Sequence, residues 1–336
     1  MILEKSADVL LLNGYTVNTN GFAYGKTGIA LTLFEIAEYL DSDRIYDHAV
    51  NLFQEVLACE VSNTDFVNGK AGIAFALQYL IKRRLLDADY MELYGKCHRD
   101  IIKKISQLQY SESEYASFLG YFLFIETSDC LSATDYIKLS EIIRNCIFRF
   151  LTGFNTENNT TDFVVISELL HAIICIQKPY GDFILEIERI FNKLILKNVN
   201  EPDTDTLLFL LQFYIYGALH EQPDIMKNTE KVLETLPNIS TANFTLRQLT
   251  DIIIYILRIY RLNNHIDYRA TAYKIMDSII SGDIDSFEQK TVRLIRNGNS
   301  LNFGLGYGFC RLLTCCLYLN KSTQNLFNDD LIKLTA

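Results

Sequence analysis

The chain has 336 residues, of which 49% are apolar, and its 31 basic and 41 acidic residues give a formal net charge of −10. This balance excludes nucleic-acid binding through a clustered cationic face, because no long run of Lys or Arg supplies one. With 4 prolines and 21% charged residues, the chain can bury enough apolar surface to offset the entropy lost on folding, which excludes a disordered protein.

The N-terminal segment carries no targeting signal that the sequence makes visible. Its apolar run covers only Val9 to Leu12, too short for the core of a secretory signal, and no segment of the chain reaches the roughly 18 uninterrupted apolar residues of a membrane span. We therefore expect a soluble, cytoplasmic protein. The eight cysteines are spread through apolar, helical segments, as at Cys175, Cys315 and Cys316, and are predicted to be reduced thiols of the core.

Two segments near the start of the chain are close copies of each other. Residues 21–40 read GFAYGKTGIALTLFEIAEYL, and residues 65–84 read DFVNGKAGIAFALQYLIKRR. They share the motif Gly-Lys-x-Gly-Ile-Ala with a period of 44 residues. Such spacing indicates duplication of one structural unit. The apolar residues recur at i, i+3 and i+4, which predicts that both segments are helices.

Further helices follow along the chain at about the same interval. Five more nearly all-apolar segments are predicted to be helices of the same kind: 113–126, 161–177, 205–220, 243–260 and 300–319. More charged, amphipathic helices are predicted between them, for example at 44–61 and 91–108. Only a helix on the outside of a two-layer structure has a solvated face, so this alternation predicts an inner and an outer helix layer.

The glycines decide between an open solenoid and a closed ring. In this chain the Gly-x-x-Gly pair opens the apolar helix, at the point where a ring narrows and backbones approach closely. The favoured fold is therefore an all-α (α/α) toroid. We expect residues 1–336 to form one domain of about seven repeats of roughly 45 residues, although six repeats are not excluded by the pattern.

The motif Gly-x-x-Gly-Ile-Ala at the start of repeated inner helices resembles that of the lanthionine synthetase C-like family. The likeness extends over nearly the whole chain through the repeat period, and the last unit matches with looser spacing. The glycines that carry it are Gly25, Gly28, Gly69, Gly72, Gly304 and Gly308. The resemblance implies a toroid of seven helical hairpins. It also implies an enzyme that uses zinc to add peptide cysteine thiols to dehydrated Ser or Thr.

The zinc ligands that the resemblance implies are missing from the sequence. In the family, two cysteines open the fifth and sixth inner helices, a ligand histidine follows the second, and a further histidine lies just ahead of the fourth. The corresponding stretches here, 203–208, 241–246 and 161–166, contain neither Cys nor His. Zinc normally holds the attacking thiol as a thiolate at neutral pH. We therefore predict that the protein has no metal site, needs no cofactor and does not cyclise peptides by the zinc route.

One Cys-His pair occurs elsewhere, at Cys97 and His98, within a charged outer helix. Adjacent residues on a helix point about 100° apart, and no second cysteine can be assigned to the same site. We interpret this pair as structural. His171, on the apolar fourth inner helix, is a candidate catalytic base, although a buried core histidine is the commoner case.

Three carboxylates are placed at predicted openings of inner helices: Asp65, Asp162 and Asp205. If they lie together at one mouth of the ring, they are candidates for acid–base chemistry on a carbohydrate, which needs a pair of carboxylates. An aspartate before a helix is also a favoured N-cap, and capping is the stronger interpretation. The absence of any Trp argues further against a sugar site.

The functional hypothesis is a zinc-less lanthionine synthetase C-like protein that binds a peptide, or a partner enzyme, in a lantibiotic-type peptide-modification pathway. The three aspartates and the net charge of −10 predict a negative mouth, which favours a cationic peptide as the guest. Two alternatives stay open: an (α/α)-toroid carbohydrate-active enzyme that uses lumenal carboxylates, and a toroidal interaction scaffold.

Overall fold

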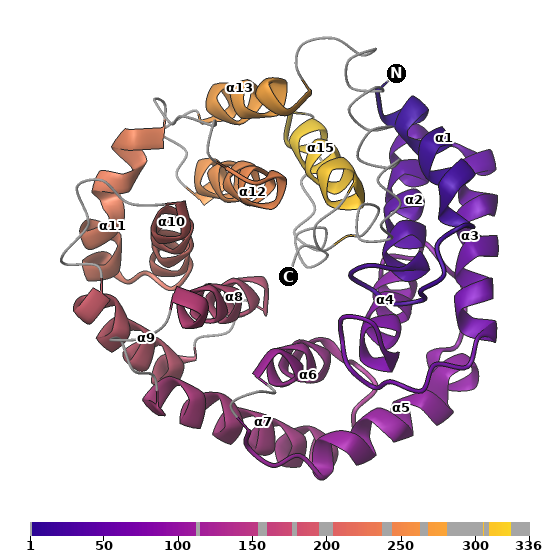
Figure 1. The fold of residues 1–336 in the computed structure, drawn as a ribbon, viewed down its shortest axis with the longest axis horizontal. Coiled ribbons are helices and arrows are strands. Elements are labelled where there is room, and N and C mark those ends of the chain that lie inside the picture. Colours follow the sequence, from indigo (N-terminus) through magenta and orange to yellow (C-terminus); the bar gives the residue numbers. More distant parts are fainter. Residues whose placement is uncertain are drawn as a thin grey trace.

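The computed structural model describes residues 2–111, 115–153, 160–176, 180–194, 204–236, 244–262, 268–280, 305 and 309–323. Within these ranges the chain forms fourteen α-helices and no strand, arranged in two concentric rings (Figure 1). The inner ring contains α2 (Lys26–Leu40), α4 (Lys70–Lys82), α6 (Tyr115–Thr127), α8 (Thr160–Ile176), α10 (Thr204–Leu219), α12 (Leu246–Leu262) and α15 (Phe309–Thr323). The outer ring contains α1 (Ile2–Gly14), α3 (Asp43–Ala58), α5 (Tyr90–Ser106), α7 (Ala133–Gly153), α9 (Gly181–Leu194), α11 (Pro223–Thr235) and α13 (Arg269–Ile280).

The two rings differ in how their helices are buried. In α10, every residue from 206 to 217 is buried, so the helix is enclosed on all sides. In α3, the buried residues form one stripe at i, i+4, i+7, i+8 and i+11: Ile45, Ala49, Leu52, Phe53 and Val56. A single apolar stripe is the pattern of a helix with one solvated face. The predicted alternation of inner and outer helices is confirmed.

The inner ring is closed. Each inner helix contacts the next one along the chain, and α15 contacts both α12 and α2, which brings the last inner helix against the first (Figure 1). An open solenoid would leave α2 and α15 apart, so the structure confirms the all-α toroid. Among the described residues, no helix is both long and apolar enough to cross a membrane.

Glycine residues allow neighbouring repeats to meet at the openings of the inner helices. A Cβ atom added at Gly72 would collide with the carbonyl oxygen of Phe66 and lie 2.6 Å from the Cβ of Phe22, which belongs to the preceding repeat. At Gly28 it would collide with the carbonyl oxygen of Phe22 and lie 3.0 Å from the Cβ of Leu305, just ahead of α15. A loop residue of one repeat therefore packs on the backbone of the next helix, and Leu305 makes this contact across the seam of the ring.

The first glycine of each motif has a different position. Gly25 and Gly69 are the N-cap residues of α2 and α4, and neither offers a side chain to cap the helix. A Cβ atom at Gly25 would lie 2.5 Å from the carbonyl oxygen of Thr19, and one at Gly69 would lie 2.6 Å from the amide nitrogen of Asp65. The chain folds back tightly ahead of both helices. Gly304 and Gly308 lie outside the described residues.

Candidate binding cavity in the ring

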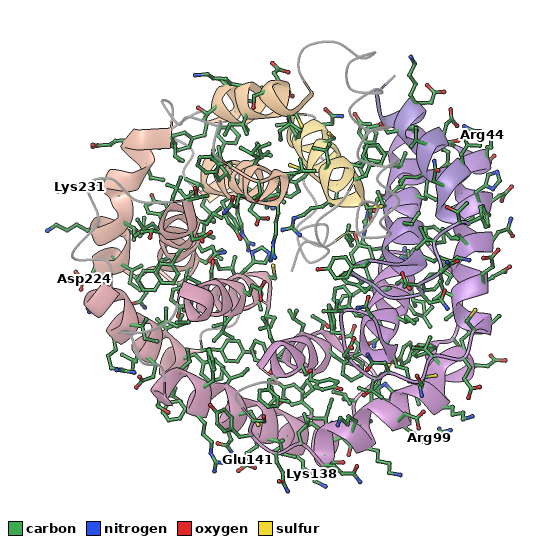
Figure 2. The ribbon with its side chains drawn as sticks, viewed as in Figure 1. Arg44, Arg99, Lys138, Glu141, Asp224 and Lys231 are labelled. Atoms are coloured by element: carbon green, nitrogen blue, oxygen red, sulfur yellow. The ribbon has the colours of Figure 1, made fainter. Side chains whose placement is uncertain are left out.

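The openings and inner faces of the inner helices enclose a cavity of about 390 Å³. Figure 2 shows side chains that end in nitrogen reaching from α12 and α15 toward the centre of the ring. The cavity wall carries charged groups on one side, among them Glu168 on α8, Arg247 and Asp251 on α12, and Arg311 on α15. These four residues therefore bring two positive and two negative charges to one side of the cavity.

The four charged residues form one ion-paired cluster. Arg247 donates through its terminal nitrogen to Glu168 Oε1 at 3.0 Å, and its Nε lies 3.8 Å from Asp251 Oδ2. Arg311 donates to Asp251 Oδ1. The Asp251 and Arg311 side chains are only 10% and 5% exposed, whereas those of Glu168 and Arg247 are 30% and 27% exposed. The cluster thus has a buried pair that joins α12 to α15 and a half-exposed pair that joins α8 to α12.

A second, neutral network lies beside the charged cluster. Ser167 donates to Gln212 Oε1 at 2.9 Å, and Gln212 donates to the Tyr255 hydroxyl oxygen at 2.6 Å. The Tyr255 hydroxyl lies 3.0 Å from His171 Nδ1. Since Tyr255 already accepts from Gln212, its own proton is directed to Nδ1, which places the remaining imidazole proton on Nε2. His171 Nε2 in turn lies 3.7 Å from the sulfur of Cys175.

Burial keeps His171 uncharged. Burial lowers the pKa of His171 to about 3, helped by the positive charges of Arg311, Arg258 and Arg247 and opposed by the negative charge of Asp251. Burial likewise raises the pKa of the Tyr255 hydroxyl well above its usual range. At neutral pH both groups therefore act as hydrogen-bonding groups without charge. They hold α8, α10 and α12 in a fixed register around the cavity.

The structure brings only some of the sequence-predicted site residues to the cavity. His171 and Asp205 line it, and exposed Asp205, in the first turn of α10, accepts from Gln248 Nε2 at 3.0 Å. Asp65 does not line the cavity. It lies five residues before the start of α4, and its Oδ1 accepts from the backbone amide of Asn68 at 2.7 Å. The expectation that Asp65 caps the inner helix is wrong, because Gly69 is the N-cap. The Asp162 side chain lies outside the described residues.

Among the described residues, the carboxylates at the cavity are Glu168, Asp205 and Asp251, so Asp205 belongs to the observed set and Asp65 does not. Sequence reasoning missed Glu168 and Asp251 and also their partners Arg247 and Arg311. A signal for them was present, since ionisable residues are rare inside the nearly all-apolar inner helices and are costly to bury unless they are paired.

The residues at the cavity do not fit a zinc ion. The zinc site that the resemblance implies uses two Cys ligands and one His ligand, and no cysteine is among the cavity-lining residues that the structure describes. His171 is engaged at both ring nitrogens. Within the described ranges, no group of three or more His, Cys, Asp or Glu side chains is placed to hold a metal ion.

The other cysteine and histidine candidates lie in the core or in the outer ring. Burial raises the pKa of the Cys310 thiol to about 12, and the Cys315 thiol donates to the carbonyl oxygen of Thr250 at 3.7 Å. These are inert packing thiols. His98, on α5, is buried with its Nδ1 2.9 Å from the Tyr90 hydroxyl, while its neighbour Cys97 is half-buried. Cys97 and His98 therefore serve the packing of an outer helix.

The fold and the cavity define a closed (α/α) toroid whose lumen is lined by both apolar and ion-paired side chains. The solved structure of a nisin cyclase matches 98% of this chain and 97% of its own chain, with a TM-score of 0.63 and 13% sequence identity, which shows that the two share a fold. No curated protein matches in sequence.

The sequence model of the lanthionine synthetase C-like proteins matches residues 2–121. This match covers the two repeats that carry the Gly-Lys-x-Gly-Ile-Ala motif, and it confirms the resemblance read from the glycines. In its N-terminal third the chain is thus similar in sequence to the lanthionine synthetase C-like proteins, and over its whole length it shares the fold of a nisin cyclase.

Proposed function

We propose that the protein binds a peptide of a lantibiotic-type modification pathway in the lumen of its ring and does not cyclise that peptide through zinc. The family match and the shared fold with a nisin cyclase support the peptide as the class of guest. The observation that carries the non-cyclising part is the cavity wall, where arginine–carboxylate pairs stand in a lumen that has no cysteine ligand among its described residues.

The physical reason is the state of the attacking thiol. A free cysteine has a pKa near 8.5, so only a small fraction is thiolate at neutral pH unless a metal or another cation stabilises the anion. The guanidinium groups of Arg247 and Arg311 are already paired with carboxylates, and His171 is neutral and hydrogen-bonded. No described group at the cavity is therefore arranged to activate a thiol.

Carbohydrate cleavage receives less support from the same geometry. Glycoside hydrolysis needs one carboxylic acid that donates a proton and one free carboxylate. Glu168 and Asp251 are both ion-paired with arginines, so neither is a protonated acid or a free carboxylate. Of the cavity carboxylates that the structure describes, Asp205 is the one without an arginine partner in the described ranges, and it accepts from Gln248. We therefore do not propose carbohydrate chemistry for this lumen.

The proposal is tested by three measurements on one preparation. Metal analysis by mass spectrometry of dialysed protein is expected to find less than a stoichiometric amount of zinc. A synthetic peptide that contains dehydroalanine and cysteine is expected to bind in a calorimetric titration, and its free-thiol content is expected to stay unchanged after incubation with the protein and added zinc.

Two results would contradict the proposal. One zinc per chain, lost when Cys97 and His98 are replaced by alanine, would restore a zinc enzyme. Loss of free thiol that depends on the protein would restore a cyclase.

Peptide binding is also expected to weaken with added salt, because salt screens the carboxylates at the cavity over about 10 Å at 0.1 M. Asp205→Asn, which preserves the hydrogen-bonding shape, should remove part of this salt dependence.

A further inference from the structure

The two sides of the lumen differ in chemistry. On one side, Phe66 from the loop ahead of α4 and Leu119 and Leu123 from α6 line the cavity. On the other side, Glu168 and Arg247 line it from α8 and α12. Figure 1 shows α6 and α12 facing each other across the centre of the ring. A guest in this cavity therefore meets an apolar wall and an ion-paired wall at once.

The apolar wall is built before any guest arrives. The ring of Phe66 packs against those of Phe22 and Phe75, with centroid distances of 5.2 Å and 5.3 Å. The Cβ of Phe66 lies so close to Gly120 on α6 that any side chain at that glycine would collide with it. Phe66 is thus fixed from two directions. A preformed apolar surface favours binding, because little ordering entropy is lost when the guest arrives.

The ion-paired wall offers a donor and an acceptor side by side. The Arg247 and Glu168 side chains are 27% and 30% exposed and are bonded at 3.0 Å, so each still presents part of its polar surface to the cavity. Asp251 holds the other edge of Arg247 through Nε. A peptide chain has the complementary groups, since its N–H can donate to the Glu168 carboxylate and its C=O can accept from the Arg247 guanidinium.

We propose that the lumen recognises an uncharged, apolar residue of its peptide guest, with the side chain on the Phe66, Leu119 and Leu123 surface and the flanking peptide groups on Glu168 and Arg247. The inference rests on the proposed function and names the residue class that the lumen selects. A cavity of about 390 Å³ is at the small end of ligand sites and suits a short peptide segment. A charged side chain is disfavoured, because the apolar wall offers it no counter-ion.

The first experiment uses small probes that carry one side chain between two peptide groups: the N-acetyl-N′-methylamides of glycine, alanine, leucine, phenylalanine and glutamate. Binding to the wild-type protein is measured by NMR titration. Burial of a leucine or phenylalanine side chain is expected to tighten binding about tenfold to a hundredfold relative to glycine. The glutamate probe is expected to bind no better than glycine. Equal affinity across the series would overturn the inference.

The second experiment locates the apolar contact. Leu119→Ser is expected to weaken the leucine and phenylalanine probes at least about fivefold and to leave the glycine probe unchanged, because only the larger side chains lose apolar contact. The matched control is Leu93→Ser on outer helix α5, where Leu93 is 50% exposed. It makes the same chemical change far from the cavity. An equal effect of both substitutions, or none at Leu119, would contradict the assignment of the wall.

The third experiment locates the peptide group. Replacing the methylamide of the phenylalanine probe by a methyl ester removes one N–H donor, which is expected to weaken binding to the wild type about twofold to tenfold. In Glu168→Ala the ester and the amide are expected to bind equally. The control is Glu186→Ala, which removes the carboxylate paired with Arg189 on outer helix α9 and should keep the wild-type difference. A persistent difference in Glu168→Ala would exclude Glu168 as the acceptor.

The failure of this inference differs from the failure of the proposed function. If the synthetic dehydroalanine- and cysteine-containing peptide binds but the probes show no preference for apolar side chains, the inference is wrong and peptide binding stands. If neither that peptide nor any probe binds to folded protein, as judged by its thermal unfolding, both are wrong.

Discussion

At the opening of α4, the absence of a side chain at Gly72 lets Phe22 of the preceding repeat lie against the helix backbone. The same contact recurs one repeat later, where Phe66 lies against Gly120, and across the seam, where Leu305 lies against Gly28. Three equivalent contacts at three junctions indicate that the loop residue and the glycine work as one packing device. An alanine at one of these glycines should therefore destabilise the protein more than an alanine at a glycine that has open space around it.

Gly72→Ala is expected to lower the free energy of unfolding by about 1–3 kcal/mol, because the new Cβ would collide with the Phe66 carbonyl and crowd Phe22. The matched control is Gly95→Ala in the middle of α5, where a Cβ would meet nothing closer than 3.5 Å. There alanine is expected to stabilise by about 0.5–1 kcal/mol through its higher helix propensity. Urea unfolding of both variants provides the measurement. Equal shifts of the same sign would refute the close-approach argument.

A second residue-scale prediction concerns acid stability. The unfolded-state pKa of a histidine is about 6.5, whereas burial lowers the pKa of His171 to about 3 in the folded state. Above pH 6.5 both states are neutral at this residue and it contributes no pH dependence. As the pH falls from 6.5 toward 3, the unfolded state binds a proton and the folded state does not, so stability is lost. The loss amounts to about 2 kcal/mol at pH 5.

His171→Asn removes the titration and retains an acceptor for the Tyr255 hydroxyl. The fall in unfolding free energy between pH 7.5 and pH 5 is therefore expected to be about 2 kcal/mol smaller in this variant than in the wild type. Tyr255→Phe serves as the control, because it breaks the same hydrogen bond without removing the histidine. Equal pH dependence in His171→Asn and wild type would show that His171 does not control acid stability.

At the scale of elements, the inner helices are joined by polar contacts that reach into the lumen. The Asp251–Arg311 pair joins α12 to α15, and both side chains are nearly buried. A buried pair often contributes little more than a well-packed apolar pair, but removal of one partner is costly, because a buried charge is left behind. The effects of substituting the two residues on the free energy of unfolding are therefore expected to be strongly non-additive.

Arg311→Met is expected to destabilise the protein by about 3 kcal/mol, because Asp251 then keeps only the longer contact to Arg247 at 3.8 Å. The double variant Arg311→Met/Asp251→Leu is expected to be about 1–3 kcal/mol less destabilised than the sum of the two single variants. The comparison pair is Arg44–Asp8, whose side chains are 56% and 50% exposed. Its coupling should stay below about 1 kcal/mol. Similar coupling energies for the two pairs would contradict the argument that burial strengthens the dependence between Asp251 and Arg311.

The element scale also explains what the sequence can and cannot predict. The alternation of apolar and amphipathic helices predicted the two helix layers, and the motif glycines favoured the closed ring, because hydrophobic periodicity and a missing side chain are both visible in short stretches of sequence. The site was harder to predict. In α10 the apolar residues surround the helix, so no amphipathic stripe indicates which face lines the lumen. The Arg247–Glu168 contact joins residues 79 positions apart, and such a pairing depends on the rotation of two helices about their axes.

Asp65 shows the opposite failure, in which a local rule was applied to the wrong position. An aspartate ahead of an apolar helix suggests an N-cap, but the chain first makes a turn that uses the Asp65 carboxylate to bind the Asn68 amide. Outer helix α5 does follow the rule, since the Asp89 side chain accepts from the Glu92 amide at 2.8 Å. The difference arises because the chain folds back tightly ahead of α4, where a Cβ atom at the N-cap Gly69 would lie 2.6 Å from the amide nitrogen of Asp65, so a capping side chain does not fit there.

For the whole molecule, closure of the ring means that every inner helix is covered on two flanks by other inner helices. The contact of α15 with both α12 and α2 completes this cover. In an open solenoid a terminal repeat can be lost with little effect on distant repeats, since each repeat contacts only its neighbours. In the closed ring, loss of α15 uncovers α2 at the other end of the sequence. Cooperativity between the two ends of the chain is thus a property of the closed topology.

A chain that ends at residue 299 lacks α15 and tests this property. We expect the amide protons of α2 and α12 to lose protection against hydrogen exchange together, because both helices lose an apolar neighbour at the same time. Helix α5 of the outer ring, which packs on inner helix α4 and outer helix α7, provides the internal reference and is expected to keep more of its protection. If α12 alone lost protection while α2 matched the full-length protein, the first and last inner helices would be independent, and the ring would behave as a solenoid.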